Sequence, residues 1–165
     1  MKKYFLLSFL TLVLISCSNA ETLHLENFIP AGKTSYSGGF ENSGYTLEIL
    51  NPITSSNNTK IITVIQRDTA TITNKVYEVN KDQIRLVFVG EENTPYIDGN
   101  KNRDEIILKT PISVGNSWIS QGFKYEIIQV IQKDSNLDVT VRKTSIDSPE
   151  YQVDTTYRYG VGILK

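Results

Sequence analysis

Hydrophobic and polar residues alternate along several segments of the chain. In residues 150–159, one set of alternate positions is aromatic, branched or hydroxylated, and the set between is charged or polar. The first set consists of Tyr151, Val153, Thr155, Tyr157 and Tyr159. Because successive side chains of a strand point to opposite faces, this pattern predicts a strand with one packed and one wet face. Residues 137–143 repeat it, with Val139 and Val141 pointing inward.

Two further segments, 60–66 and 125–132, are apolar at both alternating sets of positions. We expect them in the middle of a sheet that is covered on both sides. Residues 75–88 predict two strands joined by a turn at 80–82. After residue 16, no segment combines a 3.6-residue period with capping residues, so little helix is expected.

Gly, Pro, Asn and Asp clusters interrupt the chain every 8–14 residues, between runs rich in Ile, Val, Thr and Tyr. This spacing is typical of an antiparallel all-β domain. We expect a meander over 28–165 that closes into a barrel or forms a two-sheet sandwich, since either arrangement protects the strand edges. Residues 17–27 are polar without a strong period and predict a tether in front of the domain.

A weak internal similarity suggests a duplicated half. Residues 30–36 resemble 111–118, and residues 76–79 resemble 156–159, at offsets of 80 to 83 positions. A duplicated meander of four or five strands is the favoured interpretation. Chance similarity among β-strands is the alternative.

The N-terminus has the features of an export signal. Lys2 and Lys3 precede a twelve-residue apolar run, Tyr4 to Ile15. About 20 apolar residues are needed to span a bilayer, so the run is too short for that but suits the apolar region of a signal helix. It ends at Leu14-Ile15-Ser16-Cys17, which resembles the lipobox of bacterial lipoproteins.

The lipobox resemblance implies cleavage of a 1–16 signal peptide between Ser16 and Cys17, and a lipid on Cys17. Cys17 is the only cysteine, and acylation explains a lone cysteine in an exported chain. Two or three acyl chains hold a protein firmly, at about 0.8 kcal/mol per buried methylene. The alternatives are an ordinary secretory signal or an uncleaved anchor.

The lipobox also bears on location. Ser18, where an aspartate would suggest retention at the inner membrane, favours the outer membrane of a two-membrane cell. In a single-membrane cell the protein would lie on the outer face of the cytoplasmic membrane. Both locations are extracytoplasmic.

Composition argues against nucleic acid as a partner. Loss of residues 1–16 removes two lysines and changes the formal net charge from −1 to −3. A chain of that charge has no basic footprint for nucleic acid or for anionic lipid. The remaining length suits one domain with a real core.

Few residues of the chain could carry familiar catalysis. His24 is the only histidine and lies in the predicted tether, whereas a Ser-His-Asp hydrolase needs a fixed histidine. Zinc sites draw on several His or Cys ligands. Four carboxylates, Glu91, Glu92, Asp104 and Glu105, could work in pairs as in glycosidases, but acidic neighbours in a loop are usually solvated. We therefore expect no enzyme.

One loop has oxygen ligands at alternate positions, namely Asp98, Asn100, Asn102 and Asp104. Calcium takes oxygen ligands with such spacing from a tight loop. The EF-hand pattern fails, however, because Arg103 replaces the turn glycine and Lys109 replaces the bidentate glutamate. A solvated loop is therefore the favoured interpretation and no cofactor is expected, with calcium as the one alternative considered.

The residues 104–118 (DEIILKTPISVGNSW) and 157–165 (YRYGVGILK) resemble small uncharacterised bacterial lipoproteins. These share a D-E-I-x-L-K-x-P-x-x-x-G-x-S-W block and a terminal strand with two glycines. The resemblance implies a lipid-anchored β domain outside the cytoplasm and brings no assigned catalytic residue.

The sequence thus leads to the hypothesis of an envelope or surface lipoprotein with a non-catalytic binding domain. Its partner would be a protein or a small apolar ligand. A structural or assembly role in the envelope is the alternative, followed by an unrecognised hydrolase. A deep cavity lined by tyrosine and aliphatic residues would favour ligand binding, and an exposed apolar patch would favour a protein partner.

Overall fold

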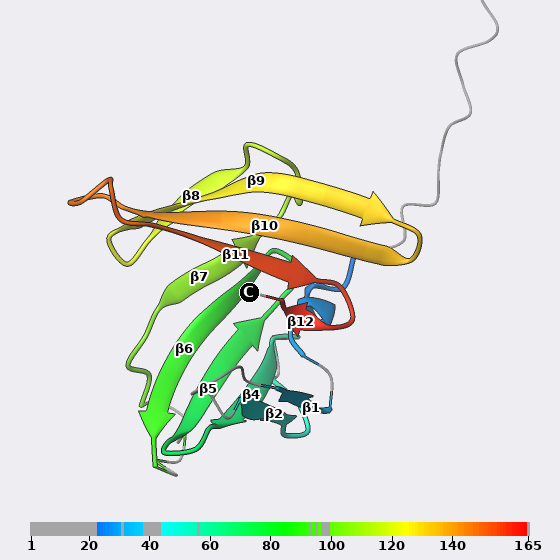
Figure 1. The fold of residues 1–165 in the computed structure, drawn as a ribbon, viewed down its shortest axis with the longest axis vertical. Coiled ribbons are helices and arrows are strands. Elements are labelled where there is room, and N and C mark those ends of the chain that lie inside the picture. Colours follow the sequence, from blue (N-terminus) through cyan, green and yellow to red (C-terminus); the bar gives the residue numbers. More distant parts are fainter. Residues whose placement is uncertain are drawn as a thin grey trace, which may run out of the picture.

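The structure is a computed structural model that describes residues 23–30, 32–37, 44–55, 57–92, 94, 96 and 100–164. Apart from one 3-10 helix, η1 (Leu25–Phe28), the regular elements of this part are all β-strands. They form two antiparallel sheets, as expected for the fold class (Figure 1). The predicted signal helix lies outside the described residues.

The first sheet has the order β1-β2-β4-β5-β6-β7, with β3 paired to β4. Its strands are β1 (Lys33–Tyr36), β2 (Tyr45–Ile49), β3 (Ile53–Thr54), β4 (Lys60–Arg67), β5 (Ile72–Val79), β6 (Gln83–Glu91) and β7 (Glu105–Lys109). The second has the order β12-β11-β10-β9-β8. Its strands are β8 (Ser117–Ser120), β9 (Phe123–Lys133), β10 (Asn136–Ser145), β11 (Gln152–Arg158) and β12 (Gly162–Ile163). Apart from β3, each sheet is therefore a meander.

The turn predicted at 80–82 is confirmed between β5 and β6. The Asn80 side-chain oxygen accepts hydrogen bonds from the backbone N–H groups of Asp82 and Gln83, at 2.9 and 3.0 Å. An asparagine that bonds to the backbone two residues on favours a turn over a continued strand. The single apolar segment 75–88 therefore folds back on itself here.

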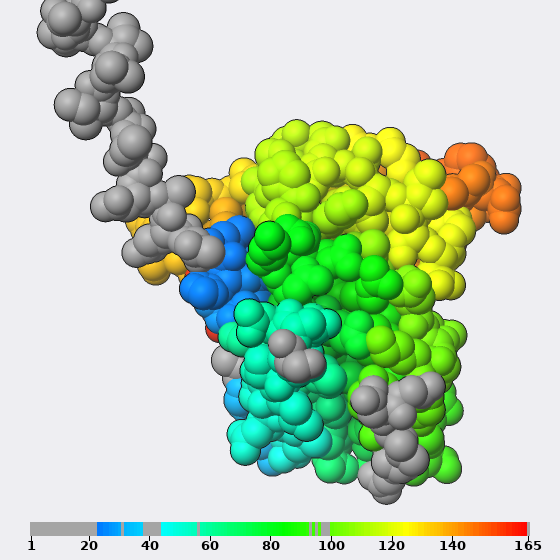
Figure 2. All heavy atoms as spheres, turned by 180° about the vertical axis from the view of Figure 1, so that it is seen from behind, coloured from blue at the N-terminus to red at the C-terminus, as the bar shows by residue number. Residues whose placement is uncertain are grey.

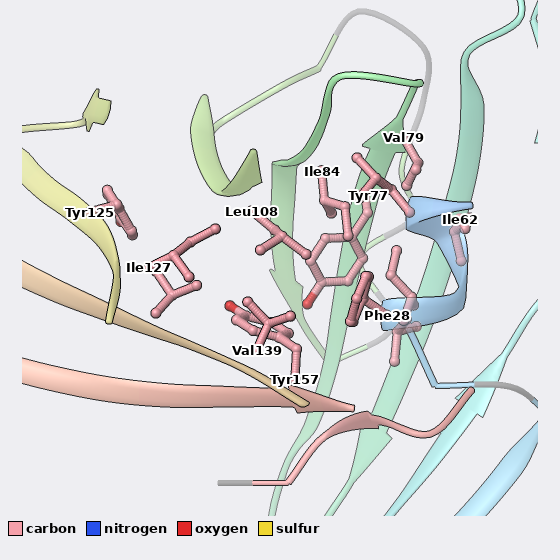
Figure 3. Packing of buried hydrophobic residues seen from close by; sticks show 14 of the residues in the cluster. Phe28, Ile62, Tyr77, Val79, Ile84, Leu108, Tyr125, Ile127, Val139 and Tyr157 are labelled. Atoms are coloured by element: carbon pink, nitrogen blue, oxygen red, sulfur yellow. The ribbon is translucent and has the colours of Figure 1, made fainter. Parts of the chain in front are cut away.

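The core lies between the two sheets. Buried residues from both, including Ile62, Val79 and Ile84 on one side and Ile127 and Val139 on the other, form one cluster (Figure 3). Seen from behind, the second sheet covers one end of the first, and η1 lies against both (Figure 2). Burial of apolar area at about 25 cal/mol per Å² is the main force that joins the two layers.

The sheets do not close into a barrel, so that alternative of the sequence analysis is wrong. Where β7 meets β8, side chains take the places of a strand ladder. The Ile106 N–H donates to Ser120 Oγ at 2.8 Å, and the Ile106 carbonyl accepts from Trp118 Nε1 at 2.8 Å. Because both polar groups of Ile106 are satisfied in this way, a neighbouring strand has nothing to pair with there.

The helix η1 fills the gap between the sheets at one end. Leu25 and Phe28 are each 1% exposed. Asn27 joins η1 to the second sheet, because its carbonyl accepts from the Gly160 N–H at 2.7 Å and its side-chain amide donates to the Tyr159 hydroxyl at 2.7 Å. The packed part of the chain therefore includes residues 25–27, which the sequence analysis assigned to the tether.

The two doubly apolar segments are both central strands, β4 and β9. Among the described residues, a buried apolar cluster on the outer face of a sheet is found in the first sheet, where Ile61 lies against Val76, Val87 and Phe88. The outward-facing Ile131 of β9 is 44% exposed. Two-sided cover is therefore found for 60–66 and is lacking at the end of 125–132.

The two sequence-similar segments occupy equivalent places. In chain order, each sheet begins with a four-residue strand. The last residue of β1 and the second residue of β8 are aromatic, and each stacks on the residue paired with it on the next strand. These pairs are Tyr36 with Tyr45, at a centroid distance of 4.6 Å, and Trp118 with Tyr125, at 5.6 Å. The duplication itself stays a prediction.

Candidate functional site

A half-open pocket of about 250 Å³ is lined by residues of both sheets. Its lining combines aromatic, aliphatic and charged side chains from β7, β9, β10 and β11. They are Glu105, Ile107, Tyr125, Val141, Lys143, Tyr151, Val153, Thr155 and Tyr157. Pockets with mainly apolar walls and a few convergent polar groups are the usual places for small ligands.

The register of the second sheet builds most of the wall. Lys143 of β10 stands between its cross-strand partners, Tyr125 on β9 and Val153 on β11. One step along the same face, Val141 is paired with Thr155. Because paired residues share a face, these positions form two adjacent rows that look toward the first sheet.

The first sheet contributes Glu105, the first residue of β7. Its neighbour Asp104 turns the other way, where it forms an exposed ion pair with Arg85. Of the four carboxylates that the sequence suggested as possible pairs, Glu105 is thus the one inside the pocket, and its side chain is 17% exposed. Asp104 and Glu105 therefore lie on different sides of β7 and do not form a carboxylate pair.

Glu105 is held by two donors from the opposite sheet. Lys143 Nζ lies 2.7 Å from its Oε1, and the Tyr125 hydroxyl donates to the same oxygen. The ammonium group of Lys143 also lies 4.1 Å from the centre of the Phe123 ring. An ammonium over an aromatic face is attracted by the ring quadrupole, so Lys143 is fixed by both a charge and a ring.

Glu105 and Tyr125 each keep one protonation state near neutral pH. Burial alone would raise the pKa of Glu105, but the hydrogen bonds from Lys143 and Tyr125 hold it below its usual value. Burial and the bond to Glu105 raise the pKa of Tyr125 well above the ordinary tyrosine value. The carboxylate therefore stays ionised and the phenol stays protonated.

The mouth of the pocket is apolar and aromatic. Tyr151 is 55% exposed and Val153 is 42% exposed, although both lie on the inner face of the second sheet. Here the second sheet extends past the cover that the first provides (Figure 1). Phe123 lies beside Tyr151, with ring centres 6.4 Å apart.

The predicted calcium ligands are used within the fold as far as they are described. The Asn102 side chain pairs with the backbone of β6, accepting from the Val89 N–H at 2.9 Å and donating to its carbonyl at 2.8 Å. Asp104 binds Arg85. Asn100 is exposed, and Asp98 lies outside the described residues. Within the described ranges no group of three or more His, Cys, Asp or Glu side chains could hold a metal.

The residues predicted for lipid attachment and signal cleavage, Cys17 and Ser16, lie outside the described part of the chain. None of the helices that the structure describes has the length and apolarity to cross a bilayer. His24 is exposed, and its Nδ1 lies 3.5 Å from a Glu26 carboxylate oxygen.

Sequence reasoning placed four pocket residues on one face, namely Tyr151, Val153, Thr155 and Tyr157, and this shared face is confirmed. It missed Lys143. The signal was present, since Lys143 continues the alternation of the two inward valines at 139 and 141. A lysine in phase with core positions needs a partner, but a single sequence does not show which carboxylate supplies it.

The comparisons with known proteins do not extend this picture. The chain matches no protein-family model, no curated protein and no solved structure.

Proposed function

We propose that this protein is a lipoprotein held at an extracytoplasmic membrane surface through Cys17, and that its β domain binds a small ligand in the pocket between the sheets. One observation carries the binding role. The pocket has a fixed polar group in its wall, the Glu105–Lys143 pair, and an exposed aromatic residue, Tyr151, at its mouth. The lipobox resemblance supports the anchor.

The protonation of the cluster supports binding over catalysis. A general acid or base works best with a pKa near the operating pH. The pKa of Glu105 is instead lowered, and that of Tyr125 is raised. Such groups keep one protonation state throughout the neutral range, which suits hydrogen bonding to a ligand.

The position of the pocket also suits a tethered receptor. The described chain begins beside η1, whereas the exposed pocket residue Tyr151 directly precedes β11, whose first residue lies at the other end of the second sheet (Figure 1). The eleven-residue strand β9 runs between these ends and is about 35 Å long at roughly 3.3 Å per residue. An anchor on the N-terminal side would leave the mouth facing away from the lipid.

The binding role is tested by native mass spectrometry of the protein extracted gently from its own cells. We expect a mass above that of the chain plus acyl groups, which corresponds to a retained small ligand. Thr155→Phe fills the pocket and should remove the extra mass. Thr144→Phe, on the opposite face of the neighbouring strand, is the matched control and should keep it. A bare mass for the unchanged protein would refute the proposal.

The anchor is tested separately by growth of the cells with labelled palmitate. The unchanged protein should carry label and sediment with membranes. Cys17→Ser should lose the label and retain the signal peptide, because the residue that is lipidated and cleaved in front is gone. Label that persists in this variant would place the lipid elsewhere.

A further inference from the structure

Two buried tyrosines lie close together here, of which Tyr157 lines the pocket and Tyr77 lies beside it (Figure 3). Tyr77 and Tyr157 are 7% and 6% exposed, and burial raises the pKa of both, reinforced by the nearby Glu105 carboxylate. Their rings lie side by side between the sheets, with the hydroxyl oxygens turned to the same side (Figure 3). Tyr125, by comparison, donates to Glu105.

Neither hydroxyl forms a hydrogen bond with the described residues, and neither is shut off from solvent. A buried polar group that lacks a partner costs free energy. The hydroxyl of Tyr157, which lines the pocket, is therefore available to atoms that enter it. Thr155, two residues earlier on β11, adds a second hydroxyl to the lining that has no bond to the described residues.

The charges of the pocket exclude a charged occupant. Glu105 and Lys143 lie 2.7 Å apart and neutralise each other. A ligand with a net charge would lose its hydration without gaining an uncompensated opposite charge, which is unfavourable in a partly buried site. A ligand that both donates and accepts hydrogen bonds meets the inner end better, since hydroxyl groups do both.

The size of the pocket and the rings at its mouth limit further which ligands can bind. At about 30 Å³ per water molecule, 250 Å³ holds roughly eight waters, which is the size of one sugar ring. At the mouth, Tyr151 and Phe123 offer ring faces, against which the C–H groups of a sugar ring pack favourably.

We propose that the pocket takes one neutral sugar ring. Its hydroxyls would bond to Tyr157 and Thr155, while its apolar face would lie against the aromatic mouth. This inference rests on the proposed ligand-binding function and differs from the apolar ligand that the sequence led us to expect. Because the pocket is half open, the ring is either a free monosaccharide or the terminal residue of a glycan.

The probe for the test is built into the chain. Trp118, the only tryptophan, stacks on the pocket residue Tyr125 with ring centres 5.6 Å apart. Its fluorescence is measured on the full-length protein in a mild detergent during titration with sugars. The neutral probes are the methyl glycosides of glucose, galactose, mannose and N-acetylglucosamine, followed by disaccharides that end in the best of them. Glucosamine and glucuronate are the charged probes.

We expect a saturable change with at least one neutral ring in the millimolar range, and affinities at least about tenfold weaker for both charged sugars. Tighter binding of a disaccharide would identify a glycan end, and equal binding would identify the free sugar. Tyr157→Phe and Thr155→Val should each weaken binding about three- to tenfold, the effect of one lost hydrogen bond.

Two matched variants control for indirect effects. Tyr159→Phe removes a tyrosine hydroxyl just after the end of β11, but one that accepts from Asn27 and does not line the pocket. Thr156→Val removes the neighbouring hydroxyl on the outer face, where it bonds to Thr140 at 2.9 Å. Both should leave sugar affinity unchanged.

Three results would overturn the inference. They are no saturable response to any neutral sugar at tens of millimolar, tighter binding of a charged sugar, or unchanged affinity in Tyr157→Phe and Thr155→Val. If native mass spectrometry still shows a bound ligand that Thr155→Phe removes, the pocket binds something else and the proposed function stands. A bare mass together with no sugar response would remove both.

Discussion

The ion pair between the two sheets offers the most direct test of the site. We consider Lys143→Met, which keeps the length of the side chain and removes its charge. In this variant Glu105, whose side chain is 17% exposed, loses its 2.7 Å contact with the ammonium group. The Tyr125 hydroxyl remains as its donor.

The expected loss lies between two known limits. Breaking a fully buried ion pair costs about 3–5 kcal/mol, and an exposed pair contributes about 0–1 kcal/mol. With exposures of 28% for Lys143 and 17% for Glu105, the pair is intermediate. Loss of the contact over Phe123 adds about 0.5 kcal/mol. We therefore expect Lys143→Met to lower the free energy of unfolding by about 2–3 kcal/mol.

Glu105→Gln should be milder, at about 1 kcal/mol, because its amide oxygen still accepts from Tyr125. In the double variant neither charge is left unpaired. Its loss should therefore be smaller than the sum of the single losses by about 1–2 kcal/mol. The assay is urea unfolding of the full-length protein in a mild detergent, followed by Trp118 fluorescence and circular dichroism.

The adjacent pair on the outer face is the control. Arg142 binds Asp154 through two contacts of 2.8 Å, but the side chains are 41% and 42% exposed. Arg142→Met should cost less than about 1 kcal/mol. If the effects of the Lys143 and Glu105 variants add within about 0.5 kcal/mol, or if Arg142→Met costs as much as Lys143→Met, the reasoning about the pocket pair is wrong.

Three further predictions follow from the fold. Gly162→Ala should lower the free energy of unfolding by about 2–4 kcal/mol, since the φ of Gly162 is +99° and a Cβ would lie 2.6 Å from the Pro30 ring. Gly160→Ala, at φ +78° with open space around it, should cost about 1 kcal/mol. Equal losses in urea unfolding would contradict this. Because the pKa of Glu105 is lowered in the folded protein, its ionised form stabilises the fold above the usual glutamate pKa of about 4.3, and this stability is lost as the pH falls through the folded pKa. Below about pH 4, the free energy of unfolding should therefore depend less on pH in Glu105→Gln than in the unchanged protein. Parallel pH profiles would show that Glu105 does not contribute to the acid sensitivity. Millimolar calcium should leave the melting temperature unchanged, because Asn102 already pairs with β6; a rise would revive the calcium hypothesis.

The correct and incorrect sequence expectations have physical explanations. Alternation identified the inner face of β11, because a half-covered strand needs apolar residues at every second position. The Asn80 turn was equally local. Within the predicted tether, Leu25 is buried by packing against distant parts of the chain, and no local pattern shows this.

The same contrast separates what the sequence determined from what the tertiary structure decided. The all-β class follows from local periodicity, as does the set of residues in each strand that faces inward. The predicted extracytoplasmic location follows from a local motif around Cys17. The choice of two open sheets instead of a barrel depends on Ser120 and Trp118 of β8, whose side chains bind the backbone of Ile106 on β7, 14 and 12 positions earlier in the chain. The pocket likewise requires Glu105 and Lys143, separated by 38 positions, to meet across two sheets. Such contacts depend on how whole layers pack, so only the folded chain reveals them.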